Sequence, residues 1–190
     1  MNRAFQSPNQ NISAATIAPW TSPSGAKLSL ANSGKTLSSA LPTYLHVPAG
    51  NGTTSIANPG YWGIDVQPVT YKGEFYVRGP YSGNFVASLI GPTGTTYAST
   101  TIPAKSVAGN WTHFTYTLQP TAAAPNTNNS LVISFDGSKA TNGALNFNFI
   151  SLFPPTYKGT PNGMRIDLAE ALAEISPSFN RFPGGNNVVS

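Results

Sequence analysis

The chain has 190 residues, enough for one domain with an appendage or for two small domains. An apolar fraction of 39% can supply a core, whereas charged residues make up only 8%, well below the roughly 25% of ordinary soluble domains. The net charge of +4 comes from ten scattered cations and six acids without a basic run, which argues against nucleic-acid binding. No apolar window approaches the roughly 18 residues of a membrane span, and no signal peptide is predicted after Met1.

The residue types that usually hold metals are scarce. There is no cysteine, so disulfides and cysteine-based metal sites are excluded. His46 and His113 are the two histidines, and neither belongs to an H-x-H or HExxH pattern, so we expect no metal and no cofactor. Four N-glycosylation acceptors weakly favour a secreted protein, and they are Asn11, Asn51, Asn110 and Asn128.

Residues 1–40 are polar and weakly patterned, with Phe5 and Trp20 as their large anchors and one or two strands at most. Short β-prone runs separated by turn residues then follow as far as residue 154, and their spacing of about ten residues predicts an antiparallel β-sandwich. The predicted strands are Tyr44–Val47, Trp62–Gln67, Glu74–Arg78, Asn84–Ile90, Thr95–Thr101, Trp111–Leu118, Leu131–Phe135 and Leu145–Phe153.

Three of these runs alternate between apolar and polar residues. Such patterning buries one face of a sheet and leaves the other in water. The side chains predicted to share a face are Phe75 with Val77, Phe147 with Phe149, and Phe114 with Tyr116 and Leu118.

The pattern changes near residue 155. Pro154-Pro155 ends the last predicted strand, and a linker covers residues 156–163. Met164–Ile175 has helical periodicity, and its apolar stripe consists of Met164, Leu168, Leu172 and Ile175. A strand at 179–182 follows, so this end of the chain is typical of one step of a parallel α/β fold.

The six acids show no arrangement typical of glycoside hydrolysis, which usually needs a carboxyl pair about 5–10 Å apart. Glu170 and Glu174 are one helical turn apart on the polar side of the predicted helix, where surface charges are expected. Asp65 and Glu74 fall near the ends of predicted strands, where turn or surface roles are commoner than catalysis. No G-x-S-x-G motif is present. We therefore expect no catalytic residue in this chain.

Aromatic side chains could stack against sugar rings, although core packing is the commoner role of such residues. The candidates are Tyr61, Trp62, Tyr71, Tyr76, Tyr81, Tyr97 and Trp111.

The last segment has the features of a ligand-binding turn. In Pro183-Gly184-Gly185 the missing side chains let another molecule approach the backbone. Asn186 and Asn187 follow with two carboxamides, which can donate and accept hydrogen bonds with sugar hydroxyls. We expect Gly185, Asn186 and Asn187 to bind substrate.

Four segments resemble fungal α-L-arabinofuranosidases of glycoside hydrolase family 51. The tail from Asn162 to Asn187, with Arg181-Phe-Pro-Gly-Gly-Asn-Asn, is the most specific. Ser151–Lys158, Gly60–Pro68 with Tyr61-Trp62-Gly63, and Asn2–Gln6 are also similar to that family. The resemblance covers nearly the whole chain.

The resemblance implies a layout and a function. Residues 1–14 would follow the first strand of a (β/α)8 barrel, 15–154 would be an inserted carbohydrate-binding-module-like sandwich of jelly-roll type, and 155–190 would be a linker with the first helix and second strand of the barrel. Asn186 would hydrogen-bond arabinose at the C-terminal end of a barrel strand. The protein would be a secreted monomer acting on arabinose-containing polysaccharide with retention of configuration.

Both catalytic glutamates of that family lie on later strands and have no counterpart here. The first hypothesis is therefore an N-terminal portion of a secreted α-L-arabinofuranosidase that is inactive alone, because its transition state needs both carboxylates. The second hypothesis is a stand-alone carbohydrate-binding or structural β-sandwich.

Overall fold

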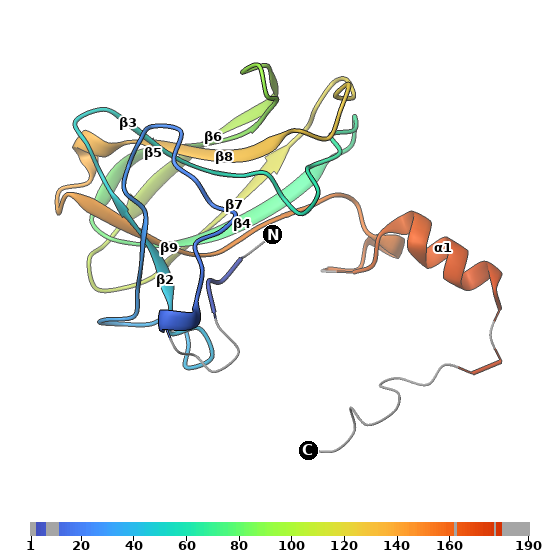
Figure 1. Cartoon of the computed structure of the whole chain (residues 1–190), viewed down its shortest axis with the longest axis horizontal. Coiled ribbons are helices and arrows are strands. Elements are labelled where there is room, and N and C mark those ends of the chain that lie inside the picture. The colour runs from blue at the N-terminus through green and yellow to red at the C-terminus, as the bar shows by residue number, and fades with distance from the viewer. Residues whose placement is uncertain (1–2, 7–11, 162, 177, 180–190) are drawn as a thin grey trace. The chain divides into compact units, whose positions relative to one another are not determined.

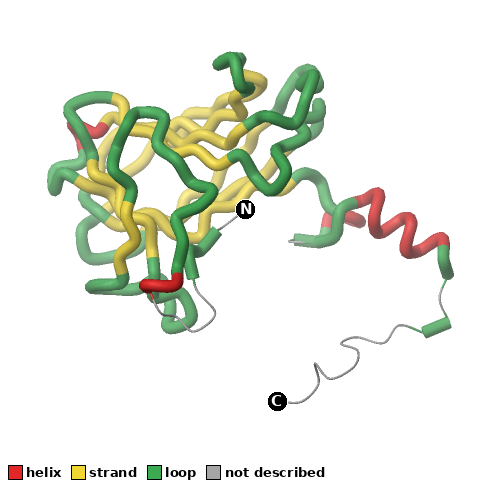
Figure 2. Tube along the Cα trace, viewed as in Figure 1, coloured by secondary structure: helices red, strands yellow, loops and turns green. Residues whose placement is uncertain are grey.

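The computed structural model describes residues 3–6, 12–161, 163–176 and 178–179. The chain divides into two compact units, Met1–Phe153 and Pro154–Ser190. The first unit is a β-sandwich, as predicted, and the second contains the α-helix (Figures 1 and 2). Among the described residues, no helix combines the length and apolar character needed to span a membrane.

Two antiparallel sheets form the sandwich. One has five strands in the order β1-β2-β9-β4-β7, namely β1 (Ser29–Ala31), β2 (Tyr44–Pro48), β9 (Ala144–Phe153), β4 (Tyr71–Arg78) and β7 (Thr112–Leu118). The other has four strands in the order β3-β8-β5-β6, namely β3 (Thr53–Asn58), β8 (Ser130–Asp136), β5 (Tyr81–Ile90) and β6 (Thr96–Ser106). Short 3-10 turns lie at Ile12–Ala14, Gly137–Lys139 and Tyr157–Gly159.

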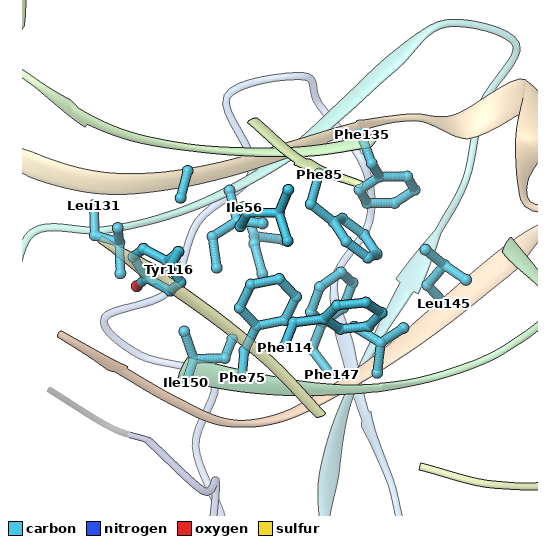
Figure 3. Close-up of a cluster of buried hydrophobic side chains, with 14 of the residues drawn as sticks. Ile56, Phe75, Phe85, Phe114, Tyr116, Leu131, Phe135, Leu145, Phe147 and Ile150 are labelled. Carbon is cyan, nitrogen blue, oxygen red and sulfur yellow. The ribbon is translucent and has the colours of Figure 1, made fainter. Parts of the chain in front are cut away.

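A cluster of phenylalanines joins the two sheets (Figure 3). Phe75 of β4 meets Phe85 of β5 edge to face, with ring centroids 5.3 Å apart. Phe147 of β9 and Phe135 of β8 lie 5.9 Å apart on the same inner faces. The predicted faces of β4 and β7 are confirmed, because Phe75, Val77, Phe114, Tyr116 and Leu118 are all buried.

The apolar interior shifts the pKa of Tyr116, the tyrosine of β7. Burial raises the pKa of the Tyr116 hydroxyl far above its usual range. That hydroxyl donates a hydrogen bond to the carbonyl oxygen of Ser151 at 2.8 Å, so the buried polar group is satisfied.

A β-bulge in β9 overturns the predicted pairing of Phe147 with Phe149. Asn148 lies opposite Tyr76 and Ser151 lies opposite Glu74, so one extra residue of β9 is accommodated between them. Phe149 has a φ of 48°, and its ring lies 6.4 Å from that of Tyr76. The bulge therefore turns Phe149 away from the core, and Ile150 takes the buried position instead.

Strand β3 was missed, because Thr53–Asn58 is too polar for a strand that is buried on both faces. Residues 21–24 cover its free edge, since β3 is the outer strand of its sheet. The Ser24 hydroxyl accepts a hydrogen bond from the Ser55 N–H at 2.9 Å, and Thr21 pairs with Ala57. Polar residues are stable there because neighbouring hydroxyls and backbone groups satisfy them.

Strand β6 is longer than the predicted Thr95–Thr101 and continues through Pro103 to Ser106. Proline cannot donate a ladder hydrogen bond and is tolerated on edge strands. β6 is the outer strand of its sheet, which explains why Pro103 does not end it.

The beginning and the end of the sandwich lie side by side. The Ile150 N–H donates to the Arg3 carbonyl oxygen at 3.0 Å. The Arg3 guanidinium lies 5.1 Å from the ring centre of Phe149 and 5.5 Å from that of Phe153, the last residue of β9. Phe5 is fully buried in the core. Cation–π contact and core packing thus fix the first segment to the last strand.

The predicted helix is confirmed, with narrower bounds. Helix α1 covers Ile166–Glu174, because Arg165 is extended and bridges to Thr156. The predicted strand at 179–182 lies outside the described residues except for Phe179, which is not in a strand. The stripe of Met164, Leu168, Leu172 and Ile175 is exposed. Ala169 is the one residue of α1 that is buried.

Helix α1 should exchange its amide hydrogens quickly. A helix of nine residues is marginal in water without packing of its apolar face, since isolated helices shorter than about 12–15 residues are barely stable. We expect residues 170–174 to reach full deuteration at least about 100-fold sooner than residues 85–89 of β5, which pairs with a strand on each side. Hydrogen exchange followed by mass spectrometry measures both segments at once, and equal protection would contradict the expectation.

Candidate functional site

The residues expected to bind substrate, Gly185, Asn186 and Asn187, lie outside the described part of the chain. The same holds for the glycosylation acceptor Asn11, whereas Asn51, Asn110 and Asn128 are exposed.

Two carboxylates have lowered pKa values. The Ser138 hydroxyl and N–H both donate to Asp136, and the hydroxyl is the main cause of the lowered pKa of that carboxyl. Arg165 donates to Asp167 and lowers its pKa in the same way. A general acid in glycoside hydrolysis needs a raised pKa. Neither Asp136 nor Asp167 is therefore suited to donate a proton at neutral pH.

The other four carboxylates also have surroundings typical of surface groups. Asp65 accepts a hydrogen bond from the Gln67 amide at 2.7 Å in an exposed loop. Glu74 pairs with His113 at 2.8 Å. Glu170 and Glu174 are exposed on α1, in agreement with the surface role expected for them.

The two histidines take part in separate side-chain pairs on the five-stranded sheet. His46 Nδ1 lies 2.8 Å from Asn146 Oδ1. The His113 ring stacks on Tyr76 at 4.4 Å and bonds Glu74 through Nε2. Within the described ranges, no group of three or more His, Cys, Asp or Glu residues could hold a metal ion.

Arg78 connects a loop to the outer face of this sheet, and the sequence did not predict this role. Its guanidinium lies 4.7 Å from the Tyr44 ring centre and 5.3 Å from that of Trp111. It also donates to the carbonyl oxygens of Ser33 and Lys35, so the loop that contains them is fixed against the sheet. Trp111 donates to the same Lys35 carbonyl at 2.9 Å. Trp111 therefore has a structural role rather than that of an open stacking surface.

The other aromatic candidates divide sharply by exposure. Tyr71 and Tyr81 are core residues, and Tyr97 packs against the core. Burial is the main cause of the raised pKa of both Tyr71 and Tyr81. Tyr61 and Trp62 differ from all of these, because they are 80% and 85% exposed.

The aromatic loop, residues 60–64, has an unusual backbone. Gly60, Trp62 and Gly63 have φ angles of 76°, 60° and 93°. This conformation is the reason that the predicted strand Trp62–Gln67 is wrong, since a strand needs negative φ throughout. Glycine enters it freely, whereas for a bulky residue such as tryptophan it costs about 1–2 kcal/mol. The glycines on both sides of Tyr61-Trp62 were the sequence signal for this turn.

Hydrogen bonds fix the aromatic loop to residues 126–129. The Ile64 N–H donates to the Thr127 carbonyl oxygen at 2.8 Å. The buried Asn129 amide donates to the carbonyl oxygens of Ile64 at 2.8 Å and Asn126 at 2.6 Å. At the other end of the loop, the Gly60 N–H donates to Asn58 Oδ1 at 2.8 Å. The loop is thus anchored at both ends while its two aromatic rings extend into solvent.

The two rings form a corner. Their centroids are 5.7 Å apart and their planes meet at 85°. Strained backbone at a bulky residue persists where the surroundings fix it, and such positions concentrate at functional sites. Among the described residues, the aromatic loop is the strongest candidate for a ligand-binding surface, and the face with Tyr76, His113 and Glu74 is the second.

No protein-family model matches the chain. Curated relatives do match. The chain is 35% identical over 188 residues to α-L-arabinofuranosidase A of Aspergillus kawachii, covering 97% of this chain and 30% of that protein. It is 39% identical over 156 residues to a probable α-L-arabinofuranosidase A of Emericella nidulans, covering 80% of this chain and 27% of the relative. The chain therefore spans less than a third of the length of the curated relatives it matches.

Solved structures agree with this relationship. An arabinose-bound family 51 α-L-arabinofuranosidase superposes with a TM-score of 0.85 at 38% identity, over 98% of this chain and 31% of that one. The resemblance to fungal family 51 α-L-arabinofuranosidases is thereby confirmed, and the chain is homologous to a part of such proteins.

More distant structures share only the fold. The xylan-binding CBM22-1 domain of Paenibacillus barcinonensis Xyn10C has a TM-score of 0.55 at 10% identity, over 80% of this chain and 91% of that domain. A cyclase of Fischerella has a TM-score of 0.56 at 12% identity, over 80% of this chain and 92% of the cyclase. A sandwich shared with proteins so different in function does not by itself define a ligand.

Substitution of Gly63 tests how closely the aromatic loop is held. A Cβ at Gly63 would lie 2.2 Å from the Thr127 carbonyl oxygen, whereas one at Gly94, with a similar φ of 83°, would meet nothing within 4 Å. We expect Gly94→Ala to lower the free energy of unfolding by about 1–2 kcal/mol through its backbone conformation alone. Gly63→Ala should cost about 1–3 kcal/mol more, because the backbones must separate. Urea denaturation measures both, and equal losses would disprove the close approach.

Proposed function

We propose that this chain is the N-terminal part of a retaining α-L-arabinofuranosidase that removes arabinose side groups from hemicellulose such as arabinoxylan or arabinan. One observation carries the proposal: 97% of the chain aligns at 35% identity with an α-L-arabinofuranosidase, of which it spans 30%. The arabinose-bound neighbour with a TM-score of 0.85 supports the same assignment.

In this proposal the sandwich, residues 15–154, is inserted into a second domain. Residues 1–14 would follow the first strand of a (β/α)8 barrel, and residues 155–190 would supply a linker, the first helix and the second strand. Adjacent chain ends are what an inserted domain needs. The contacts of Arg3 with Ile150, Phe149 and Phe153 bring the segment that precedes the sandwich next to its last strand, and they support this plan.

Helix α1 also supports the plan. Its exposed apolar stripe is what a barrel helix would bury against strands and neighbouring helices. In the barrel, Gly185, Asn186 and Asn187 would form one wall of the pocket for the arabinose unit, with Asn186 hydrogen-bonded to the sugar.

The 190 residues alone would not hydrolyse glycosides. An oxocarbenium-like transition state needs an acid/base and a nucleophile about 5–5.5 Å apart in a retaining enzyme. The six carboxylates of this chain have surface surroundings, and the two with resolved pKa shifts are shifted downward, away from acid function. The catalytic pair would come from other parts of the longer protein.

A second candidate function is a stand-alone carbohydrate-binding module. The observation that favours it is the exposed pair Tyr61 and Trp62, since tyrosine and tryptophan are enriched at binding interfaces. In the first candidate the sandwich is part of a longer enzyme, whereas in the second it binds carbohydrate without a catalytic domain.

An activity assay with a chromogenic arabinofuranoside separates the candidates. The purified 190-residue chain should give no turnover above buffer, whereas a longer protein that contains this sequence and a complete barrel should be active. The matched binding measurement is retention of the 190-residue chain on arabinoxylan. Turnover by the short chain would disprove the account of the missing carboxylates. Inactivity of both proteins would leave only the binding-module candidate.

Secretion and N-glycosylation form a separate part of the proposal. Asn51, Asn110 and Asn128 are exposed acceptors, which supports it. Expression through the secretory pathway of yeast should yield protein whose mass falls on treatment with an endoglycosidase. Asn51→Gln and Asn128→Gln should each remove one glycan, whereas Asn126→Gln, at an exposed asparagine outside any acceptor motif, should remove none. An unchanged mass in the treated wild-type protein would contradict this part.

A further inference from the structure

We propose that Tyr61 and Trp62 bind the pyranose main chain of a neutral hemicellulose such as xylan, rather than its arabinose side groups. The inference rests on the proposed function, because it gives the sandwich the task of holding the polysaccharide whose side groups the longer protein removes. The site is the aromatic loop, residues 60–64.

Exposure and rigidity are combined in this loop. Adjacent exposed apolar side chains mark interaction sites, whereas singly scattered ones are common on protein surfaces. Here two are adjacent, 80% and 85% exposed, on a backbone that hydrogen bonds hold at Gly60 and Ile64. A binding group that is already fixed loses little conformational entropy when the ligand arrives. The strained backbone of Trp62, with its positive φ, therefore holds the indole ring in the conformation that binds the ligand.

The charge around the loop suits a neutral ligand. The sequence from Ala57 to Ile64 contains no charged residue, and the sequence from Gln119 to Ser130, whose Thr127 holds the loop, contains none either. Exposed amides and hydroxyls at Asn126, Thr127 and Asn128 are available for sugar hydroxyls. The next residue after the loop, Asp65, is exposed and would repel an acidic polysaccharide or peptide, and neither segment supplies a cation to hold one.

The size of the aromatic pair favours a sugar over a protein partner. An aromatic side chain buries about 150–250 Å², so the pair offers roughly 300–500 Å². A stable protein partner needs about 800 Å² on each side, which is well beyond these two side chains. One or two sugar rings match the available area.

Ring geometry favours a pyranose. A pyranose with equatorial hydroxyls presents a flat face of C–H groups that can lie on an indole, whereas a furanose is smaller and puckered. The planes of Tyr61 and Trp62 meet at 85°, so a flat ring on the indole would meet the phenol at its side. Xylose in the main chain has this shape, and arabinofuranose does not.

A rival occupant is the protein's own glycan. Asn128 follows Thr127, whose carbonyl oxygen accepts the hydrogen bond from Ile64, so a glycan on Asn128 would be attached close to the aromatic loop. Production in a bacterial host, which adds no such glycan, leaves the loop free for the test.

The test measures binding of the unglycosylated 190-residue chain by affinity electrophoresis in gels that contain arabinoxylan, debranched xylan or linear arabinan. We expect retardation by both xylans and none by linear arabinan. Trp62→Gly should weaken binding to debranched xylan by roughly 10-fold, the loss of one aromatic contact. Because glycine accepts the positive φ, this variant should not melt below the wild-type protein.

Two matched variants serve as controls. Phe179→Ala removes another exposed aromatic ring, 81% exposed, and should leave binding unchanged. Tyr76→Ala tests the rival sheet face with His113 and Glu74, and it should also leave binding unchanged.

Three results would overturn the inference: binding unaffected by Trp62→Gly, binding abolished by Tyr76→Ala, or preference for linear arabinan. Failure of the wild-type chain to bind any of the three polysaccharides would overturn it as well. None of these results bears on hydrolysis by the longer protein, so the assay with a chromogenic arabinofuranoside remains an independent test of the proposed function.

Discussion

The contact between the inner faces of the two sheets is the constraint on which the rest of the structure depends. Five phenylalanines from five strands meet there, and the rings of Phe75, Phe85 and Phe147 each contact both sheets. A buried phenylalanine reduced to alanine typically costs about 3–5 kcal/mol, comparable with the whole stability of many domains. With so few charges in the chain, apolar packing and hydrogen bonding have to supply nearly all of the stability. The loops that connect the strands, including residues 60–64, are held in position relative to one another because the two inner faces are fixed.

Much of the sandwich could be predicted because period-two alternation is a direct result of burying one face. Strand β7 follows it throughout, and β4 follows it except at Arg78, which is buried on the outer face. The features that were not predicted have a common cause, because contacts between residues distant in sequence override the local pattern. Polar β3 is stable because Thr21 and Ser24 satisfy it from outside, and the bulge at Phe149 depends on its pairing with β4.

The site was only partly predictable for the same reason. Seven aromatics were candidates, and sequence alone could not separate the buried Tyr71 and Tyr81 from the exposed Tyr61 and Trp62. Their separation depends on the hydrogen bonds from residues 127 and 129, more than sixty positions away. Arg78 between Tyr44 and Trp111 was missed because nothing in its own strand indicates what approaches from residues 33–35.

The junction between Arg3 and β9 also determines how the sandwich responds to mechanical force. Because Arg3 and β9 are neighbours, a pull on these two segments acts on one small zone. That zone consists of the hydrogen bond from Ile150 to Arg3 and the two cation–π contacts. These contacts would take the load before the pairing of β9 with β2 and β4 does. A pull on the two segments would therefore break these contacts before it separates the phenylalanines between the sheets.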